Sequence, residues 1–145
     1  MTYWDTSAIL KLYLAEPDSR YFLELIAKTN APVFSSAIAA AEALCALHCK
    51  EHAGDLKRGG AKALFQQFCE DCKAGRIVTI PYGDDVVAEA EKLVRLAFAQ
   101  PRPVMIRSLD LIHVASALAG KARQLVATDQ RLRELAGLVR LSLLP

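Results

Sequence analysis

The stretch Gln124-Leu-Val-Ala-Thr-Asp129 is an apolar run that ends in an acidic residue, and Gln130-Arg-Leu-Arg-Glu-Leu135 follows it with helical spacing of its leucines. We predict a strand up to Thr128 and a short helix from Asp129 to Leu135. Thr2-Tyr-Trp-Asp5 has the same form at the start of the chain, where a short strand again reaches an acid. Both segments are typical of strands in a parallel sheet, each followed by a crossover helix.

The rest of the chain continues this alternation of short apolar runs and longer amphipathic segments. The expected helices cover Ser7–Ala15 (interrupted by Pro17), Asp18 to a break at Asn30–Pro32, a Ser35 or Ser36 cap to about Glu51 (ended by Gly54), Lys57–Lys73, an Asp84 or Asp85 cap to about Phe98, and Leu109–Ala119 after Ser108. The further expected strands are Val33–Ser35, Arg76–Ile80 and Val139–Leu143. Strands separated by helices imply right-handed crossovers and a mostly parallel sheet covered on both faces, which is an α/β fold.

Length and composition favour one compact domain over residues 1–145, since 53% of the residues are hydrophobic. The net charge of +2 is too small for a protein that binds nucleic acid by charge alone, so contacts with RNA are expected to be local. The first residues do not resemble a signal peptide, and no apolar run reaches the roughly 20 residues that span a bilayer. We therefore expect a soluble, cytoplasmic protein with no membrane contact.

Soft metal ligands form a separate group of residues, namely Cys45, Cys49, Cys69, Cys72, His48 and His52. The cysteines pair at i,i+4 and i,i+3, so a tetrathiolate site is sterically conceivable if the two helices face each other. Both pairs lie in Ala/Leu/Phe-rich helical stretches, which favours cysteines that act as small buried apolar residues. The two histidines are expected at the surface.

Two acids, Asp5 and Asp129, follow the ends of predicted strands. In open parallel sheets the reactive cleft lies beyond the carboxyl ends of the strands, so both side chains are candidates for a functional site. The alternative for each is a helix N-cap, which is a common role for Asp at this position.

Two other acids, Glu42 and Asp110, have mostly apolar helical neighbours. An unpaired charge at the edge of the core costs several kcal/mol, so each requires a cation, a hydrogen-bond network or a raised pKa. The alternatives are an ion pair with Arg107 for Asp110 and solvent access for Glu42. His113 shares a helix face with Asp110 and is expected to pack beside it or orient it.

Four acids in one cleft need a counter-charge, because each like-charged pair about 4 Å apart costs about 4 kcal/mol at an effective dielectric of about 20. Mg²⁺ or Mn²⁺ prefers carboxylate oxygen and retained water, without histidine or thiolate ligands. One or two such ions would activate water for attack on a phosphodiester. The spacing does not fix the number of ions.

With these residues in this order, the chain resembles a PIN domain of the VapC toxin type. The resemblance rests on Asp5-Thr-Ser7-Ala, on Ser36 with Glu42 six residues later, on Arg107-Ser-Leu-Asp110-Leu-Ile-His113-Val-Ala115-Ser-Ala117, and on Ala127-Thr-Asp129-Gln-Arg-Leu132. It implies a three-layer α/β/α sandwich, Mg²⁺- or Mn²⁺-dependent cleavage of RNA, a cognate antitoxin and a homodimer. It assigns metal binding and catalysis to Asp5, Glu42, Asp110 and Asp129, with Thr6, Ser7, Ser36 and Thr128 as supporting hydroxyls and His113 beside them.

Basic residues that could guide the RNA backbone are Lys11, Arg102, Arg107 and Arg131. Apolar side chains in Tyr13–Ile26 and around Leu44 and Leu47 could form a dimer or antitoxin groove, or could equally pack against each other. Two alternatives to a toxin-type endoribonuclease stay open: an RNA- or protein-binding module without the chemistry, and an aspartate-based phosphatase with Asp5 as nucleophile. The phosphatase is disfavoured because Ser7 stands where its second acid is expected.

Overall fold

A computed structural model describes residues 1–29 and 31–145. Their strands are β1 Thr2–Trp4, β2 Val33–Ser36, β3 Ile77–Ile80, β4 Gln124–Val126 and β5 Ser142–Leu144. Their helices are α1 Thr6–Leu10, α2 Ser19–Thr29, α3 Ala39–Ala53, α4 Gly60–Lys73, α5 Asp84–Phe98, α6 Ser108–Ala119 and α7 Gln130–Leu138. The strands form one sheet in the order β3-β2-β1-β4-β5, and all neighbouring pairs are parallel.

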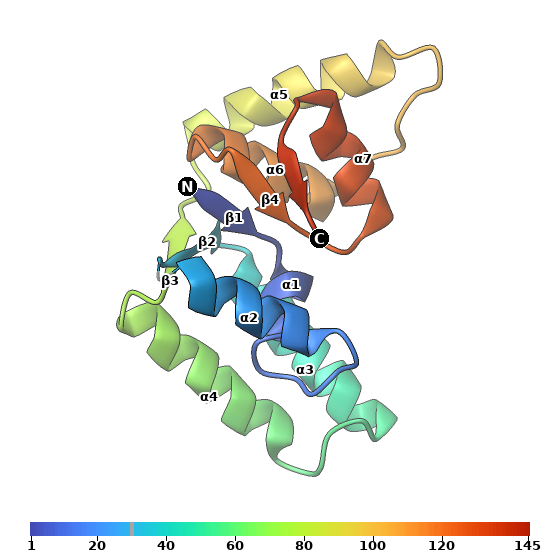
Figure 1. Ribbon diagram of the computed structural model, residues 1–145. Helices are drawn as coiled ribbons and strands as arrows, with labels where there is room; N and C mark the ends of the chain where they lie inside the picture. Colours follow the sequence, from blue (N-terminus) through green and yellow to red (C-terminus); the bar gives the residue numbers. More distant parts are fainter. Residues whose placement is uncertain (30) are drawn as a thin grey trace.

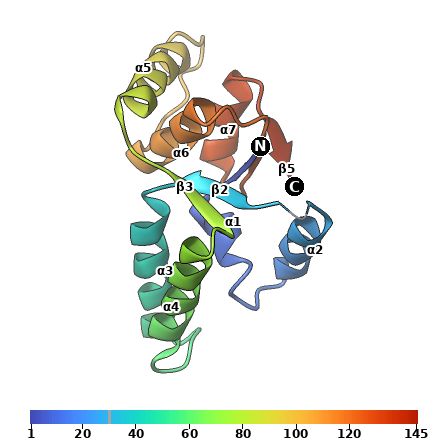
Figure 2. The same cartoon turned by 90° about the vertical axis from the view of Figure 1, so that its left-hand side faces the viewer.

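Helices cover both faces of this sheet. Figures 1 and 2 show α1 to α4 on one side of the strands and α5 to α7 on the other. Side chains alternate between the two faces along a strand, so Trp4 and Val126 enter the core under α1 to α4. Tyr3 and Leu125 enter the core under α5 to α7. The expected three-layer α/β/α sandwich with a parallel sheet is confirmed.

The register of the central strands aligns their carboxyl ends. Tyr3 on β1 lies opposite Phe34 on β2, and Trp4 lies opposite Val126 on β4. The backbone N–H of Asp5 donates to the carbonyl of Val126 at 3.0 Å, one residue beyond the assigned end of β1. The residues that follow β1, β2 and β4 therefore lie at one edge of the sheet.

Several helix starts differ from the sequence prediction. The helix α3 does not begin at a serine cap, because Ser36 still belongs to β2 and Ile38 precedes the first helical residue. Gly83, not Asp84 or Asp85, occupies the position before α5. Sequence patterns indicate that Ser and Asp lie near helix starts, but they do not show at which residue the strand ends and the helix begins.

Two segment ends also differ. The first helix ends at Leu10 instead of Ala15, and a turn follows in which the Ser19 hydroxyl donates to the Leu14 carbonyl at 2.6 Å. The last strand begins at Ser142 instead of Val139, because α7 continues to Leu138 and Arg140 has a φ of 57°. Asn30, which the sequence prediction places at the end of the second helix, lies outside the described residues.

The cysteines occupy different surroundings from those expected. Cys45 and Cys49 are exposed on α3, whereas Cys69 and Cys72 on α4 pack partly buried against the core. Among the described residues, no three cysteine or histidine side chains are grouped to hold a metal ion, so a tetrathiolate within the chain is not supported. Within residues 1–29 and 31–145, no helix is long and apolar enough to cross a membrane.

Candidate functional site

Asp5 stands where β1 passes into α1. Its Oδ1 accepts from the backbone N–H of Ala8 at 2.7 Å, and its Oδ2 accepts from the Ser7 hydroxyl at 2.8 Å. The residue is 4% exposed. Burial raises the pKa of the Asp5 carboxyl, and the charge of Glu42 raises it further, while the bonds from Ala8 and Ser7 oppose this. Asp5 is thus the N-cap of α1, and its carboxyl also has a raised pKa.

Glu42, in the first turn of α3, belongs to a buried chain of polar groups. Its Oε2 accepts from Nε2 of His113 at 2.7 Å and from the Thr6 hydroxyl. The other ring nitrogen of His113, Nδ1, lies 2.7 Å from the hydroxyl of Tyr3. Burial acts to raise the pKa of Glu42, but the hydrogen bond and charge of His113 and the bond from Thr6 outweigh it, so the pKa is lowered.

This chain of contacts corrects the expectation for His113. The histidine is 3% exposed, and its described hydrogen bonds go to Glu42, Tyr3 and Thr6, not to its helical neighbour Asp110. Solvent access alone therefore does not explain Glu42. The cause is geometric, because the imidazole of His113 on α6 reaches Tyr3 of β1 with one ring nitrogen and Glu42 of α3 with the other.

Asp110, in the first turn of α6, has an unusual oxygen atom. Its Oδ2 is the one buried side-chain nitrogen or oxygen without a hydrogen-bond partner in the described part of the chain. Burial raises the pKa of the Asp110 carboxyl, and the charge of Asp129 raises it further. The charge of Arg107 acts in the opposite direction, yet the salt bridges among the described residues do not join these two. The simple ion-pair explanation for Asp110 is therefore wrong.

Asp129 is the N-cap of α7. Its Oδ1 accepts from the backbone N–H groups of Arg131 at 2.9 Å and of Leu132 at 3.2 Å. Its negative charge reaches Asp110, whose pKa it raises. The N-cap role is therefore present, and the charge of the same carboxylate acts on a neighbouring acid.

The four acids act on one another across the sheet edge. Glu42 raises the pKa of both Asp5 and Asp110, and Asp129 raises that of Asp110. These acids come from β1/α1, α3, α6 and the β4/α7 turn, and they lie close enough for the charges of Glu42 and Asp129 to act on Asp110 and for that of Glu42 to act on Asp5. Hydroxyls join two of these segments, because Ser7 Oγ lies 3.3 Å from Oγ1 of Thr128.

Ser36 is placed differently from the other hydroxyls. It is fully buried and accepts from the Ser116 hydroxyl at 3.1 Å, while its bond from the N–H of Ile38 is long, at 3.5 Å. Its described contacts include none of the four acids. Ser36 therefore ties β2 to α6 and supports the site through the backbone.

The donor types fit a hard divalent cation, since all four acids offer carboxylate oxygen. The orphaned Asp110 Oδ2 is the observation that calls for such a partner, because a buried oxygen without one is costly. Among residues 1–29 and 31–145, no three His, Cys, Asp or Glu side chains already enclose a metal position. Glu42 is instead held by His113 and Thr6, both through Oε2, and Asp129 is held by its own helix.

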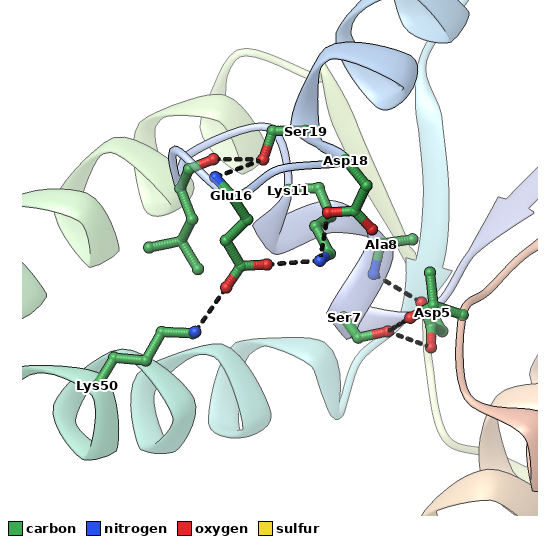
Figure 3. A network of polar contacts seen from close by, with 10 residues as sticks. Asp5, Ser7, Ala8, Lys11, Glu16, Asp18, Ser19 and Lys50 are labelled. Atoms are coloured by element: carbon green, nitrogen blue, oxygen red, sulfur yellow. Dashed lines mark hydrogen bonds and ion pairs between the residues drawn. The ribbon is translucent and has the colours of Figure 1, made fainter. Parts of the chain in front are cut away.

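The four basic residues proposed to guide RNA differ in whether acidic side chains of the chain already neutralise their charges. Lys11 Nζ contacts Glu16 at 2.5 Å and Asp18 at 2.7 Å, and Glu16 also contacts Lys50 (Figure 3). The remaining three, Arg102, Arg107 and Arg131, are exposed. The charge of Lys11 is therefore already compensated within the chain.

Tyr3 and Ser116 are polar members of this network that the sequence prediction missed. Tyr3 is fully buried, and burial raises the pKa of its hydroxyl, which keeps it a donor. A sequence signal existed for Tyr3, because a strand residue two positions before Asp5 points to the same face and a buried hydroxyl needs a partner. Nothing in the local pattern around Ser116 indicated its contact with Ser36.

Comparisons with known proteins add a family and a fold. A family model described as "PIN domain" matches residues 2–138. The chain is similar to VapBC2 from Rickettsia felis, solved bound to a DNA fragment from the promoter, with a TM-score of 0.69 and 21% identity over 99% of this chain and 97% of that chain. A search of curated proteins gives no match.

Two further solved structures are similar. FitAB bound to an IR36 DNA fragment has a TM-score of 0.70 and 17% identity, over 99% of this chain and 94% of that chain. FitAcB from Neisseria gonorrhoeae has a TM-score of 0.66 and 18% identity, over 100% of this chain and 97% of that chain. At these identities the likeness concerns the fold.

Proposed function

The chain belongs to the PIN-domain family, and from this premise we propose that it is a divalent-metal-dependent endoribonuclease that acts as the toxin of a toxin–antitoxin pair. The single observation that carries the metal dependence is the buried Oδ2 of Asp110, which has no hydrogen-bond partner among the described residues. The negative charges of Asp129 and Glu42 raise the pKa of Asp110, and Glu42 also raises that of Asp5, because like charges repel one another unless a cation joins them. This combination favours a nuclease over a module that kept only the fold.

In this proposal Asp5, Glu42, Asp110 and Asp129 hold one or two Mg²⁺ or Mn²⁺ ions. When bound, the metal supplies an activated water and stabilises charge on the phosphodiester. The chain's own groups orient the acids: the Ser7 hydroxyl donates to Asp5, and His113 and Thr6 donate to Glu42. Groups that fix the direction of a ligand in this way commonly change metal affinity or activity by 10- to 100-fold.

RNA is the proposed substrate, and the exposed arginines are the proposed backbone contacts. Arg107 acts on the Asp110 carboxyl through its charge, and Arg131 directly follows the Asp129 segment. Both are placed to meet a phosphate near the acids. Lys11 is a weaker candidate because Glu16 and Asp18 already neutralise it.

A cognate antitoxin and a homodimer are the proposed protein partners. Support for an antitoxin comes from similar chains that were solved as parts of the VapBC2 and FitAB complexes. Within Tyr13–Ile26, Tyr21 and Leu23 are exposed and available to a partner. Leu44 is exposed as well, whereas Leu47 is fully buried, so the expectation of a partner surface at Leu47 is wrong.

The test of the nuclease is Asp110→Asn, compared with Asp55→Asn as a control at an exposed acid beyond the end of α3. We expect Asp110→Asn to slow Mg²⁺- or Mn²⁺-dependent RNA cleavage by at least about 100-fold, and Asp55→Asn to leave it unchanged. Calorimetric titration with Mn²⁺ measures metal binding separately. Equal cleavage by the wild type and Asp110→Asn would exclude the proposed site, and failure of the wild type to bind Mn²⁺ would favour a binding module.

A further inference from the structure

A second group of metal-ligating side chains lies on α3, on a surface of its own. Cys45 and His48, and Cys49 and His52, are three residues apart, and Cys45 and Cys49, and His48 and His52, are four apart, so the four side chains share one face of the helix. All four are exposed. We call this surface the Cys/His face. None of its four residues belongs to the hydrogen-bonded network around Glu42 at the start of the same helix.

The composition of the Cys/His face is unusual for an exposed surface. Free cysteine is among the residue types most often buried, and the other two cysteines of the chain do pack against the core. The four residues, together with Ala41 and Leu44, line a surface hollow of about 510 Å³. The face therefore offers thiols and imidazoles in an apolar setting, where charged side chains are normally found.

The chemistry of these donors selects a particular class of ion. Thiolate and imidazole bind Zn²⁺ and related transition metals, whereas Mg²⁺ and Mn²⁺ prefer oxygen. Two histidines at i,i+4 on one helix form a known chelating pair for Zn²⁺, and Cys45 and Cys49 have the same spacing. The Cys/His face and the carboxylate cluster thus suit different metals.

A single chain does not complete such a site. Structural Zn²⁺ takes four nitrogen or sulfur ligands in a tetrahedron. Within residues 1–29 and 31–145, no three such side chains converge on a common point, so the helix offers an ion one pair at a time. The missing ligands have to come from outside the chain, and a second Cys/His face supplies the same donor types.

We propose that the Cys/His face binds a Zn²⁺-like transition-metal ion that is shared between two copies of the chain, with Cys45 and Cys49 from one copy and His48 and His52 from the other. Leu44, which is 40% exposed beside Cys45, and Ala41 then form an apolar contact around the ion. This inference does not depend on the proposed nuclease function, and it goes beyond the proposed homodimer by assigning that contact to the Cys/His face and making it depend on the metal ion.

Binding exchanges protons for metal and involves no oxidation. Each coordinating thiol releases its proton to solvent as the metal–sulfur bond forms. Zn²⁺ affinity is therefore expected to fall as the pH is lowered.

The experiment uses Co²⁺ as a spectroscopic probe for Zn²⁺. Co²⁺ is titrated into the reduced full chain with excess Mg²⁺ present to occupy oxygen sites, while absorption and sedimentation are recorded. We expect the charge-transfer band of cobalt–thiolate bonds or the visible bands of tetrahedral cobalt, and a doubling of the mass that chelator reverses. The double variant Cys45→Ser/Cys49→Ser is expected to lose the mass change and any thiolate band, and His48→Gln/His52→Gln to bind at least tenfold more weakly.

The matched control is Cys69→Ala/Cys72→Ala, which removes the two thiols of α4 and is expected to keep both signals. Retention of the bands and the mass change by Cys45→Ser/Cys49→Ser would overturn the proposal. So would tetrahedral bands without a change of mass, which place the ion on one chain. A dimer that survives chelator but not reductant would point to a disulfide and overturn it as well.

Discussion

The hydroxyl of Tyr3 lies 2.7 Å from Nδ1 of His113, and the opposite ring nitrogen lies 2.7 Å from Oε2 of Glu42. Because a carboxylate only accepts, Nε2–H of the imidazole donates to Glu42, and in the neutral ring Nδ1 accepts from Tyr3. Glu42 therefore fixes Nε2 as the nitrogen that carries the proton, and Tyr3 on β1 holds the ring in place through Nδ1. Through His113, Tyr3 determines the position of a carboxylate on α3.

Removing this hydroxyl tests its positioning role. Tyr3→Phe is expected to lower the free energy of unfolding by about 1–3 kcal/mol, since Nδ1 of His113 loses its buried donor. Cleavage of RNA is expected to fall by about tenfold, which is the lower range for a group that orients a metal ligand. The ¹⁵N resonance of Nδ1 of His113 reports the loss of its hydrogen bond, which simple loss of packing would not cause.

Tyr13→Phe is the matched control for this substitution. Tyr13 donates its hydroxyl to Asp71, away from the four acids. A similar loss of stability with unchanged cleavage is expected there. If Tyr3→Phe also leaves cleavage and the His113 resonances unchanged, Tyr3 has no positioning role.

The two roles of Asp129 are separable by choice of substitution. Asn is as good an N-cap as Asp, so Asp129→Asn is expected to keep the stability of the wild type within a few tenths of a kcal/mol. Asp129→Ala removes the bonds to Arg131 and Leu132 and is expected to cost about 1 kcal/mol. Both variants are expected to lose cleavage equally. Full activity of Asp129→Asn would reduce this residue to a cap.

The pKa of Asp110 predicts how stability without divalent cation depends on pH. Because the pKa is raised in the folded state, this carboxyl stabilises the fold below its unfolded pKa and loses that contribution as pH rises through the folded pKa. Asp110→Asn mimics the protonated form. In chelator at neutral pH it is expected to be about 1 kcal/mol more stable than the wild type, or roughly 2–4 °C in thermal midpoint.

The same pair of proteins provides the control. The advantage of Asp110→Asn is expected to vanish as the pH is lowered towards about 4, where the wild-type carboxyl is also protonated. Mg²⁺ is expected to raise the midpoint of the wild type and not that of the variant, since only the binding-competent fold gains from the ligand. If Asp110→Asn is less stable than the wild type in chelator, the unpaired Oδ2 of Asp110 does not destabilise the metal-free protein.

The arginines and Lys11 are distinguished by salt dependence. If Arg107 and Arg131 contact phosphates, each neutral substitution is expected to reduce the slope of log affinity against log salt for single-stranded RNA by about 0.7. Lys11→Gln is expected to change the slope less, because Glu16 and Asp18 hold its charge. Binding is measured with Ca²⁺ in place of Mg²⁺ to prevent turnover. Equal slopes for all three variants would contradict this assignment.

The local sequence determined the order of elements and the type of fold. The apolar runs before Asp5 and Asp129, each followed by helical spacing, encode a strand and then a crossover helix. These periodicities are properties of a few neighbouring residues, so they can be recognised without knowing the partners. Glu42 and Asp110 could also be recognised from the sequence, because burying a carboxylate among apolar neighbours costs free energy wherever the segment packs. The metal and catalytic roles of those acids stay predictions.

Only the tertiary structure determined which side chains contact one another across the fold. His113 was expected beside Asp110, yet it contacts Glu42 and Tyr3, residues that lie 71 and 110 positions away in the chain. Cys45 and Cys49 were expected in the core, yet α3 turns them to solvent and points Leu47 inward. Helical spacing fixes which residues share a face, but the direction of that face depends on the helices and strands packed around it. The direction of each helix face depends on the packing of the whole core, so the sequence of one segment does not determine it.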